Sequence, residues 1–484
     1  MPAAALATRP HVAVVGGGIA GLTAALEVLE RLPGARVTVL EGRDRLGGTL
    51  RLEEVAGHRV DVGAESLLAV RPEAVDLARR TGAAADLVSP ATTSANVWSR
   101  GGLHPLPRAT LMGVPTDPGA ALGVLTEDEV ARATDERPWP GGTVTEDVAV
   151  GEYVATRLGQ AVVDRLVEPL LGGVYAGHAS RLSLEATMPA LWARAVAGDS
   201  IVGSGPPTSA AADRPAGSGR PVFAGLRGGV GRLPELVAAR LRDLGAELRT
   251  SAVVRGLERT GSGWRLVVGS AAQPEAVEAD AVLLCVPPAP AARLLRPHAP
   301  VAADRLGEVE TASTAVVTLA VERAGLGPLP GSGFLVPPVE GRTIKASTFS
   351  AVKWGWTGAL ADDVVHLRAS IGRAREEAVL QRDDAELVSV SVAEVSEALG
   401  QRLPRVVDAH VQRWGGGLPQ YAVGHVARTS AVRAAVAALP GVHVAGAAYD
   451  GVGVPAVVAS ATRAARAATE YLSTVATPSG EPTR

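Results

Sequence analysis

Cysteine is almost absent from this 484-residue chain, in which Cys285 is the only one. An internal disulfide is therefore excluded, and so are zinc and iron–sulfur sites built from several cysteines. Long apolar runs are missing as well: no stretch of about 20 apolar residues occurs, and residues 1–10 contain no apolar segment typical of a secretory leader. We therefore expect a cytoplasmic protein without a transmembrane segment, while peripheral contact with a membrane stays open.

An excess of one charge is also lacking. The 47 basic side chains nearly balance the 50 acidic ones, for a formal net charge of −3, so there is no general basic field for nucleic acid. Lysine is rare, because all basic residues except Lys345 and Lys353 are arginine. Most arginines are interpreted as solvated surface charges, and the two lysines become candidates for selected positions.

The chain does have the material for a large core. Hydrophobic residues make up 47% of it and charged residues 20%, which excludes global disorder. At roughly 100–200 residues per domain, its length predicts two or three globular units. No internal repeat is visible in the sequence, so these units are expected to differ from one another.

The clearest local signal is a glycine-rich segment, Gly16–Gly21, between two short apolar runs. The first run, residues 11–15, leads into these glycines and an apolar pattern at helical spacing, and the second, residues 36–40, ends at Glu41. Strand, glycine-rich turn, helix, strand and acid in this order predict a βαβ unit that binds a dinucleotide. The helix N-terminus would attract the phosphates, and Glu41 would accept hydrogen bonds from ribose hydroxyls.

The residues after Glu41 discriminate between dinucleotides. They read E-x-x-x-R-x-G-G, in which Arg45 can reach a phosphate and Gly47-Gly48 bring the backbone close to the cofactor. A NAD site needs no such extension, and the segment resembles the second half of the fingerprint of FAD enzymes in the amine-oxidase-like group. Residues 61–66 resemble the segment that runs beneath the isoalloxazine ring in that group.

Apolar periodicity outlines the remaining elements. Residues 198–221, rich in Gly, Pro, Ser and Ala, predict a flexible surface loop, and residues 476–484 predict a disordered tail. Helices are expected at residues 150–158, 161–171, 233–244 and 456–471, and strands at residues 247–250, 252–257, 264–268, 281–286 and 443–446.

Cofactor-type segments recur along the chain, separated by two inserts. We therefore expect an α/β protein with a Rossmann-type FAD-binding domain, discontinuous in sequence, an inserted α+β substrate domain and a helical region, as in amine-oxidase-like proteins. The FAD-binding domain would comprise residues 1–75, 223–290 and 413–475, the helical region (equivalent to a membrane-like domain) residues 76–222, and the substrate-binding domain residues 291–412.

Four further segments resemble signatures of the protoporphyrinogen/coproporphyrinogen oxidase family. With the flavin fingerprint they follow the family's order from residue 11 to residue 470, and the resemblance is strongest to the coproporphyrinogen III oxidases of Gram-positive bacteria. The four segments are Gly173–Gly177 with Arg181–Ser183, Leu226–Gly229 with Leu233-Pro234, Leu418–Tyr421 with Gly424-His425, and Gly446–Val452.

The resemblance implies a noncovalently bound FAD. Many relatives carry a cysteine just after the position of Val454, where this chain has none, and Cys285 lies in an apolar pattern typical of an inert buried residue. For Val253 and Trp414, ordinary core packing is the alternative interpretation. The implied FAD contacts are Gly16, Gly17, Gly18, Ile19, Ala20, Gly21, Glu41, Gly42, Arg45, Thr49, Gly63, Ala64, Glu65, Ser66, Val253, Trp414, Val452, Gly453 and Val454.

The family's reaction is the six-electron oxidation of a porphyrinogen in haem biosynthesis. It implies three flavin cycles, in each of which a hydride leaves a bridge carbon, with O2 as the oxidant, H2O2 as the by-product and handover of the product to a ferrochelatase as an open step. Because the pyrrole nitrogens stabilise the developing cation, no protein base is assigned. His178 and His425 are the nearest candidates by position, and a structural role is favoured for both.

Cations are expected to bind the propionates of the substrate. Arg71 matches a position where the family places a propionate-binding base, with a surface arginine as the alternative, and Tyr175 would pack either on the macrocycle or in the core. Lys345 and Lys353 lie in a segment that resembles the Gram-positive branch. They would pair with the additional carboxylates of coproporphyrinogen III, and a solvated face is the alternative.

Three competing functions stay open at this point. Protoporphyrinogen IX is the alternative substrate within the same family. An amine oxidase or a carotenoid desaturase would be another amine-oxidase-like flavoenzyme, but these lack the combined signals at Gly173–Gly177 and Leu418–Tyr421. A catalytically silent FAD-binding protein that carries a porphyrin is the non-enzymatic alternative, which the intact motifs disfavour.

Overall fold

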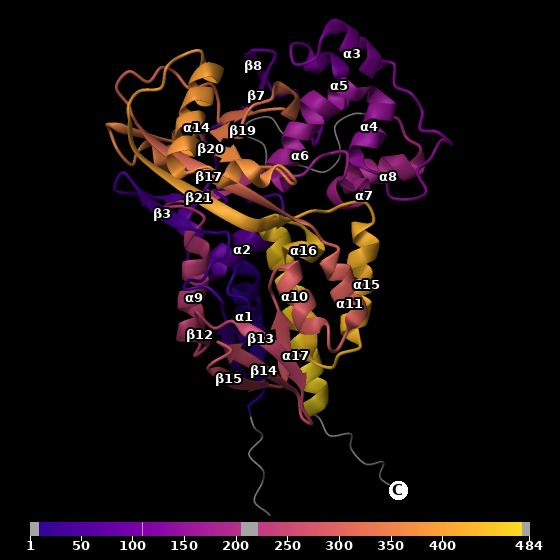
Figure 1. Ribbon diagram of the computed structural model, residues 1–484, viewed down its shortest axis with the longest axis vertical. Coiled ribbons are helices and arrows are strands. Elements are labelled where there is room, and N and C mark those ends of the chain that lie inside the picture. The colour runs from indigo at the N-terminus through magenta and orange to yellow at the C-terminus, as the bar shows by residue number, and fades with distance from the viewer. Residues whose placement is uncertain (1–8, 109, 205–220, 477–484) are drawn as a thin grey trace, which may run out of the picture.

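The computed structural model describes residues 9–108, 110–204 and 221–476, and in it these residues form two halves stacked along the long axis (Figure 1). The half at the bottom of the view contains a parallel sheet and its covering helices, and the half at the top contains a mixed sheet beside a group of helices. The loop predicted at residues 198–221 and the tail predicted at residues 476–484 fall largely outside the described ranges.

A five-stranded parallel sheet forms the centre of the lower half, with the strand order β12-β2-β1-β16-β22. All five residues of β1 are buried, because helices or strands cover both faces of the sheet, and this explains the unbroken apolar run in the sequence. The strands come from three distant parts of the chain: β1 (His11–Val15), β2 (Arg36–Leu40), β12 (Glu247–Arg249), β16 (Ala281–Leu284) and β22 (Val442–Val444).

Two hydrophobic cores lie on opposite faces of this sheet. One is shared with α1 (Ile19–Arg31), α9 (Arg232–Asp243) and α17 (Val454–Ala476), which confirms the predicted strand–turn–helix–strand start of the chain. The other is shared with an antiparallel sheet and three helices, namely β13 (Val254–Arg259), β14 (Trp264–Gly269), β15 (Pro274–Ala279), α10 (Pro288–Leu295), α11 (Pro300–Gly307) and α15 (His425–Ala437).

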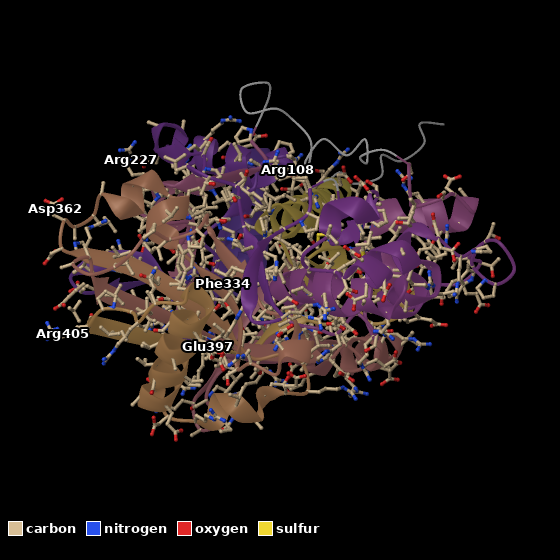
Figure 2. All side chains as sticks on the ribbon, turned by 90° about the horizontal axis from the view of Figure 1, so that it is seen from above. Arg108, Arg227, Phe334, Asp362, Glu397 and Arg405 are labelled. Carbon is tan, nitrogen blue, oxygen red and sulfur yellow. The ribbon has the colours of Figure 1, made fainter. Side chains whose placement is uncertain are left out.

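The upper half is built on a seven-stranded mixed sheet with the order β21-β17-β20-β19-β18-β7-β8. Its core includes Phe334, which is 2% exposed and lies near the centre of Figure 2, while Asp362 and Arg405 lie at the margin of that view. Helix α14 (Asp384–Leu399) packs on this core. The strands are β21 (Val406–Pro419), β17 (Thr311–Glu322), β20 (Val364–Ile371), β19 (Ile344–Thr348), β18 (Gly333–Leu335), β7 (Asn96–Ser99) and β8 (Gly102–Pro105).

The helices beside this sheet surround a separate core. The helix predicted at residues 161–171 is an interrupted run, in which a π-helical turn at Val163–Val167 precedes α6 (Glu168–Tyr175). Pro169 near the start of α6 has no N–H to donate, so the regular ladder cannot continue through it. The other helices are α3 (Glu127–Thr134), α4 (Val150–Leu158), α5 (Gln160–Val162), α7 (Leu184–Thr187) and α8 (Pro189–Ala197).

Three segments pack with a different part of the molecule from the domain to which the sequence assigned them. Residues 96–105 form β7 and β8 of the seven-stranded sheet, because β7 pairs in parallel with β18. Residues 413–419 continue β21 in that same sheet, and α10 and α11 pack against the parallel sheet. Such pairings join segments far apart in sequence, so local patterns cannot reveal them; the division into domains stays a proposal.

Candidate functional site

The glycine-rich turn after β1 has room only for glycine at two positions. Gly16 has a φ of +105°, and a Cβ there would lie 2.4 Å from the carbonyl oxygen of Cys285. A Cβ on Gly21 would lie 1.8 Å from the carbonyl oxygen of Gly16. The two glycines therefore let α1 start directly above the end of β1 and pack closely against it.

The amino end of α1 is suited to a phosphate. Gly18 is its N-cap, no side chain caps the first turn, and the first turn contains no acidic residue. No side chain of the first turn therefore neutralises the positive end of the helix dipole. Glu41 lies beside this turn at the end of β2, where its carboxylate accepts hydrogen bonds from the backbone N–H groups of Gly17 (2.6 Å) and Arg43 (2.8 Å).

The second half of the fingerprint lies against the first. A Cβ on Gly48 would be 3.2 Å from the Cα of Gly18, so the two glycine segments touch. Arg45 donates a hydrogen bond to the carbonyl of Gly48 at 2.7 Å, and its guanidinium lies 5.8 Å from the ring centre of Trp414. Burial lowers the pKa of Arg45, as expected for a cation partly withdrawn from water.

Residues 61–66 contact the second half of the fingerprint at Gly63. A Cβ there would lie 2.0 Å from the carbonyl oxygen of Thr49 and 3.4 Å from the Trp414 ring. Trp414 donates a hydrogen bond from Nε1 to the carbonyl of Val62 at 3.1 Å and is only 7% exposed. It packs with Val62 and Val316, as expected if Trp414 serves ordinary core packing. Val253 lies 3.3 Å from the Cβ position of Gly42.

Glu65 is the centre of a buried ionic cluster that joins the two halves of the molecule. Its carboxylate accepts hydrogen bonds from Lys353 Nζ (2.9 Å), Arg368 Nη1 (2.8 Å) and Ser350 Oγ (2.8 Å). Arg368 also donates to the carbonyl of Gly63. Burial by itself would raise the pKa of Glu65, but the charges of Lys353 and Arg368 outweigh it and hold this pKa well below its ordinary value.

The cluster bears on two residues predicted to contact ligands. Lys353, expected to meet a substrate carboxylate, already has Glu65 as its ion-pair partner and donates a second hydrogen bond to Ser66 Oγ at 2.8 Å. Glu65 directs its carboxylate to these side chains. Arg368 was missed by sequence reasoning, although a charged residue within the apolar strand β20 is the kind of signal that points to a buried function.

A second buried acid holds the loop that follows β11 (Phe223–Leu226). Asp61 accepts hydrogen bonds from the backbone N–H groups of Val230 (2.9 Å) and Gly231 (2.7 Å). Burial raises the pKa of Asp61 to about 7. Asp61 thus connects the segment before Gly63 to the family segment made of Leu226–Gly229 and Leu233-Pro234, at the start of α9.

Tyr421 and Gln420 connect the remaining family segments. The Tyr421 hydroxyl donates to the carbonyl of Ala447 and accepts from the backbone N–H of Gly451 at 2.7 Å, so it holds the loop that leads to Val452–Val454. Gln420 Nε2 donates to the carbonyl of Tyr175 at the end of α6, at 2.7 Å. The Tyr175 and Tyr421 rings lie 5.6 Å apart.

The structure places Arg71 and Tyr175 in different environments. Arg71 is the N-cap residue of α2 (Pro72–Arg80); its side chain is 41% exposed and pairs with Glu73 at 2.8 Å. Tyr175 is 7% exposed, and burial raises the pKa of its hydroxyl to about 12. Arg71 is therefore accessible to an anion that could compete with Glu73, whereas Tyr175 is mostly enclosed.

The two histidines have contacts typical of structural residues. His425 stacks on Tyr421 with ring centres 3.8 Å apart, and burial lowers its pKa to about 4, which leaves the imidazole neutral at pH 7. His178 lies 3.3 Å from the carboxylate of Glu376. Burial raises the pKa of the Cys285 thiol to about 12, so the thiol stays protonated. Among the described residues, no group of His, Cys, Asp and Glu side chains could hold a metal ion.

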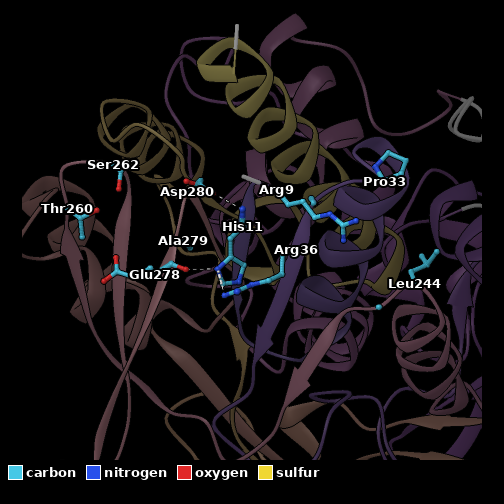
Figure 3. A pocket seen from close by; sticks show the side chains of 12 residues that line it. Arg9, His11, Pro33, Arg36, Leu244, Thr260, Ser262, Glu278, Ala279 and Asp280 are labelled. Carbon is cyan, nitrogen blue, oxygen red and sulfur yellow. Dashed lines mark hydrogen bonds between the residues drawn. The ribbon is translucent and has the colours of Figure 1, made fainter. Parts of the chain in front are cut away.

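A cavity of about 520 Å³ lies beside the amino ends of the parallel strands, at the other end of the sheet from Gly16 and Glu41 (Figure 3). It is lined by residues at the amino ends of β1 and β2, including His11 and Arg36, together with Glu278 and Asp280. Ligands of open parallel sheets bind beyond the carboxyl ends of the strands, where Gly16 and Glu41 lie. This cavity is therefore separate from the dinucleotide site.

The described ranges contain no helix that is both long and apolar enough to cross a membrane. Five of the six segments predicted to bind FAD contact one another near the carboxyl ends of β1 and β2, through the pairs Gly17–Glu41, Gly18–Gly48, Gly42–Val253 and Gly63–Trp414. The uncapped amino end of α1, the close approach of Gly18 and Gly48, and the carboxylate of Glu41 fit a dinucleotide that carries two phosphates and a ribose.

Comparison with known proteins gives consistent matches over nearly the whole chain. Residues 19–469 match the family model of flavin-containing amine oxidoreductases. The chain is 36% identical to the coproporphyrinogen III oxidase of Mycobacterium bovis, over 95% of this chain and 97% of that protein, and 29% identical to that of Bacillus subtilis, over 96% and 99%. A solved structure from Exiguobacterium sp. 255-15, provisionally described as a protoporphyrinogen oxidase, superposes with a TM-score of 0.82 at 32% identity, over 95% of this chain and 99% of that one.

Proposed function

Because this chain belongs to the family of flavin-containing amine oxidoreductases and is therefore a flavin-dependent oxidoreductase, we propose that it binds FAD noncovalently and oxidises coproporphyrinogen III to coproporphyrin III. The reaction removes six electrons, so three O2 would be consumed and three H2O2 released for each porphyrin formed. The observation that carries the proposal is the joint presence of the dinucleotide cradle around Gly16, Gly48 and Glu41 and the extended likeness to coproporphyrinogen III oxidases.

FAD would be held by the residues that meet at the end of β1. The amino end of α1 would bind the pyrophosphate, Glu41 would turn its carboxylate to the ribose hydroxyls, and the Thr49 and Gly63 backbones would lie close to the ring system. When bound, FAD supplies the two-electron acceptor. Cys285 is a protonated, partly enclosed thiol, and no other cysteine exists for a covalent link.

The chain's own contribution to the chemistry would be binding and orientation. Arg71 is placed to pair with a propionate, and Tyr175 on α6 would pack against one face of the macrocycle. His425 is neutral but stacked and enclosed, so we assign no protein base. Protons lost from the pyrrole nitrogens would pass to water.

One assay separates this proposal from its rivals. The FAD-loaded protein is mixed anaerobically with coproporphyrinogen III, protoporphyrinogen IX or a polyamine, and bleaching of the flavin is recorded. We expect rapid bleaching by coproporphyrinogen III, slower bleaching by protoporphyrinogen IX and none by the polyamine. Faster bleaching by protoporphyrinogen IX would reverse the substrate assignment, and bleaching only by the polyamine would refute porphyrinogen oxidation altogether.

The mode of FAD binding has its own test. Acid precipitation should release the yellow chromophore into the supernatant, where chromatography identifies it as FAD. Chromophore retained in the washed pellet would show a covalent link. We also propose that the protein acts in haem biosynthesis, as the names of its relatives suggest, that it lies in the cytoplasm and that it hands its product to a ferrochelatase.

A further inference from the structure

Lys345 is a buried cation without a counter-ion. It lies in β19 at the irregular step between Ile344 and Ala346, where the pairing with β20 shifts by one residue. The residue is 6% exposed, and its ammonium makes no hydrogen bond to any residue that the structure describes. The charged side chain whose field reaches it is Arg373, which is also a cation. This arrangement contrasts with Lys353, whose charge is neutralised by Glu65.

Arg373 shares the same end of the sheet. It follows β20, is 5% exposed and donates a hydrogen bond from Nη2 to the carbonyl of Val336 at 2.9 Å. The backbone N–H of Val336 in turn donates to the carbonyl of Lys345 at 2.9 Å. Val336, directly after β18, thus contacts the Arg373 guanidinium and the backbone of Lys345.

Helix α6 covers this pair. A Cβ on Gly172 would lie 4.0 Å from Arg373 Nε, and one on Gly173 would lie 3.7 Å from Leu335 at the end of β18. These glycines let α6 approach the sheet, and the same helix ends at Tyr175, a proposed substrate contact. Arg373 therefore lies between the end of the sheet and the helix that carries Tyr175.

The acidic groups of the surrounding elements pair with other residues or act on Arg373, and Oε2 of Glu168 is buried without a hydrogen-bond partner among the described residues. On α14, Glu394 accepts from the backbone N–H groups of Thr343 and Ile344, and Glu397 pairs with Arg342. On α6, Glu168 accepts a hydrogen bond from the backbone N–H of Ala179 and lies within the field of Arg373. Glu376 lies 4.0 Å from the Arg373 guanidinium. On β20, Arg368 is paired with Glu65. The uncompensated charge is therefore that of Lys345.

We propose that Lys345 and Arg373 form a binding site for one carboxylate of the substrate, which is a propionate if the proposed function holds. A buried ammonium without a partner is costly, and an incoming carboxylate would remove that cost. Arginine offers a planar fork and lysine a point charge, so the two can share a single carboxylate. The inference rests on the proposed function for the identity of the ligand, but its test does not depend on turnover.

This site has a built-in dependence on pH. Burial, together with the charge of Arg373, lowers the pKa of Lys345 to about 7. A bound carboxylate favours the ammonium and raises that pKa, so binding above about pH 7 must take up a proton. Affinity for the carboxylate should therefore fall as the pH rises above about 7, by at most about tenfold per pH unit for a single proton.

The test measures the binding of coproporphyrin III, the tetracarboxylate product, to the FAD-loaded protein by fluorescence between about pH 6 and about pH 9. Lys345→Met should weaken binding about ten- to a hundredfold at the low end of this range and remove the pH dependence. Lys345→Arg, whose charge does not titrate, should retain affinity and also lose the pH dependence. Arg342→Gln, which removes a half-buried cation three residues away that is already paired with Glu397, is the matched control and should bind like wild type.

A stability measurement separates ligand binding from a structural role. If Lys345 serves only the ligand, Lys345→Met should melt at or above the wild-type temperature without porphyrin, because it removes an unpaired buried charge. Unchanged affinity and pH profile in Lys345→Met, or a lower melting temperature together with a lost fold, would overturn the inference. If coproporphyrinogen III bleaches the flavin of the wild-type protein, the proposed function stands whatever the Lys345 variants show. Failure of the carboxylate site and failure of the proposed function are therefore distinguishable.

Discussion

The hydroxyl of Tyr421 accepts a hydrogen bond from the backbone N–H of Gly451 at 2.7 Å while donating to the carbonyl of Ala447. One side-chain oxygen therefore fixes both ends of the short α16 (Ala447–Asp450), just before the loop proposed to meet the flavin. Because Tyr421 is 3% exposed, water cannot readily replace either partner.

Tyr421→Phe is expected to destabilise the protein by about 1–3 kcal/mol, because it leaves a buried N–H and a buried carbonyl without partners. The flavin absorption spectrum should shift as well, since the loop that follows becomes less ordered. Thermal unfolding and absorption spectra of the FAD-loaded protein would measure both effects. Tyr175→Phe is the control, since it removes the hydroxyl of the neighbouring ring, for which no hydrogen bond to a described residue is found. An equal loss of stability there would show that the two hydrogen bonds of Tyr421 are not the cause.

Glu41→Ala should weaken FAD binding about ten- to a hundredfold, which corresponds to losing hydrogen bonds to a charged acceptor worth roughly 1.5–3 kcal/mol. In the structure the same carboxylate also caps the N–H of Gly17, so the turn before α1 loses support. Titration of apoprotein with FAD is the measurement. The FAD affinity of Glu41→Gln should lie between those of wild type and Glu41→Ala, because its amide oxygen retains one acceptor. An unchanged affinity in Glu41→Ala would argue against the dinucleotide assignment.

Arg71→Ala should raise the apparent KM for the porphyrinogen about tenfold or more, with FAD content unchanged, if Arg71 makes a charge-assisted bond to a propionate. The pairing of Arg71 with Glu73 adds a second expectation. Glu73→Gln should lower KM, because it removes the competitor for the guanidinium. Steady-state kinetics of Arg71→Ala and Glu73→Gln test both expectations. If KM changes in neither variant, Arg71 is a surface charge without a role in substrate binding.

Glu65→Gln should destabilise the protein at neutral pH by about 1.5–3 kcal/mol, because Lys353 and Arg368 lose their buried counter-ion. The pKa of Glu65 is depressed in the folded state, so its contribution is present above the ordinary carboxyl pKa and is lost as the pH falls toward the folded value. The gap between wild type and variant in melting temperature should therefore stay constant from about pH 7 to about pH 5 and narrow only as the pH falls below about 4.5. Glu235→Gln, at the exposed pair with Arg59, should show almost no effect at any pH.

Local patterns were sufficient for the first elements of the chain. The βαβ start could be predicted because short apolar runs, glycine spacing and an acid at the end of β2 all act within the first 41 residues. The helices at α4 and α9 likewise follow from their own amphipathic periodicity. In these elements the information that fixes the structure lies within a few turns of chain.

The ionic cluster around Glu65 could not be predicted in this way. Its partners Ser350, Lys353 and Arg368 lie 285 to 303 residues further along the chain, and three-dimensional folding alone brings them together. Composition made Lys345 and Lys353 conspicuous but gave no means to tell them apart. The structure distinguishes them, because one has a carboxylate partner and the other has none.

The pairing of β16 with both β1 and β22 has a consequence for synthesis. Strand β1 is made first, but the sheet it belongs to lacks its edge until residues 442–444 exist, and α17, which shares a core with α1, follows later still. At about 5–20 residues per second, the intervening chain takes from about twenty to about ninety seconds to translate. During that time the apolar faces of β1 and α1 have only part of their final cover, so nascent chains should depend on chaperones.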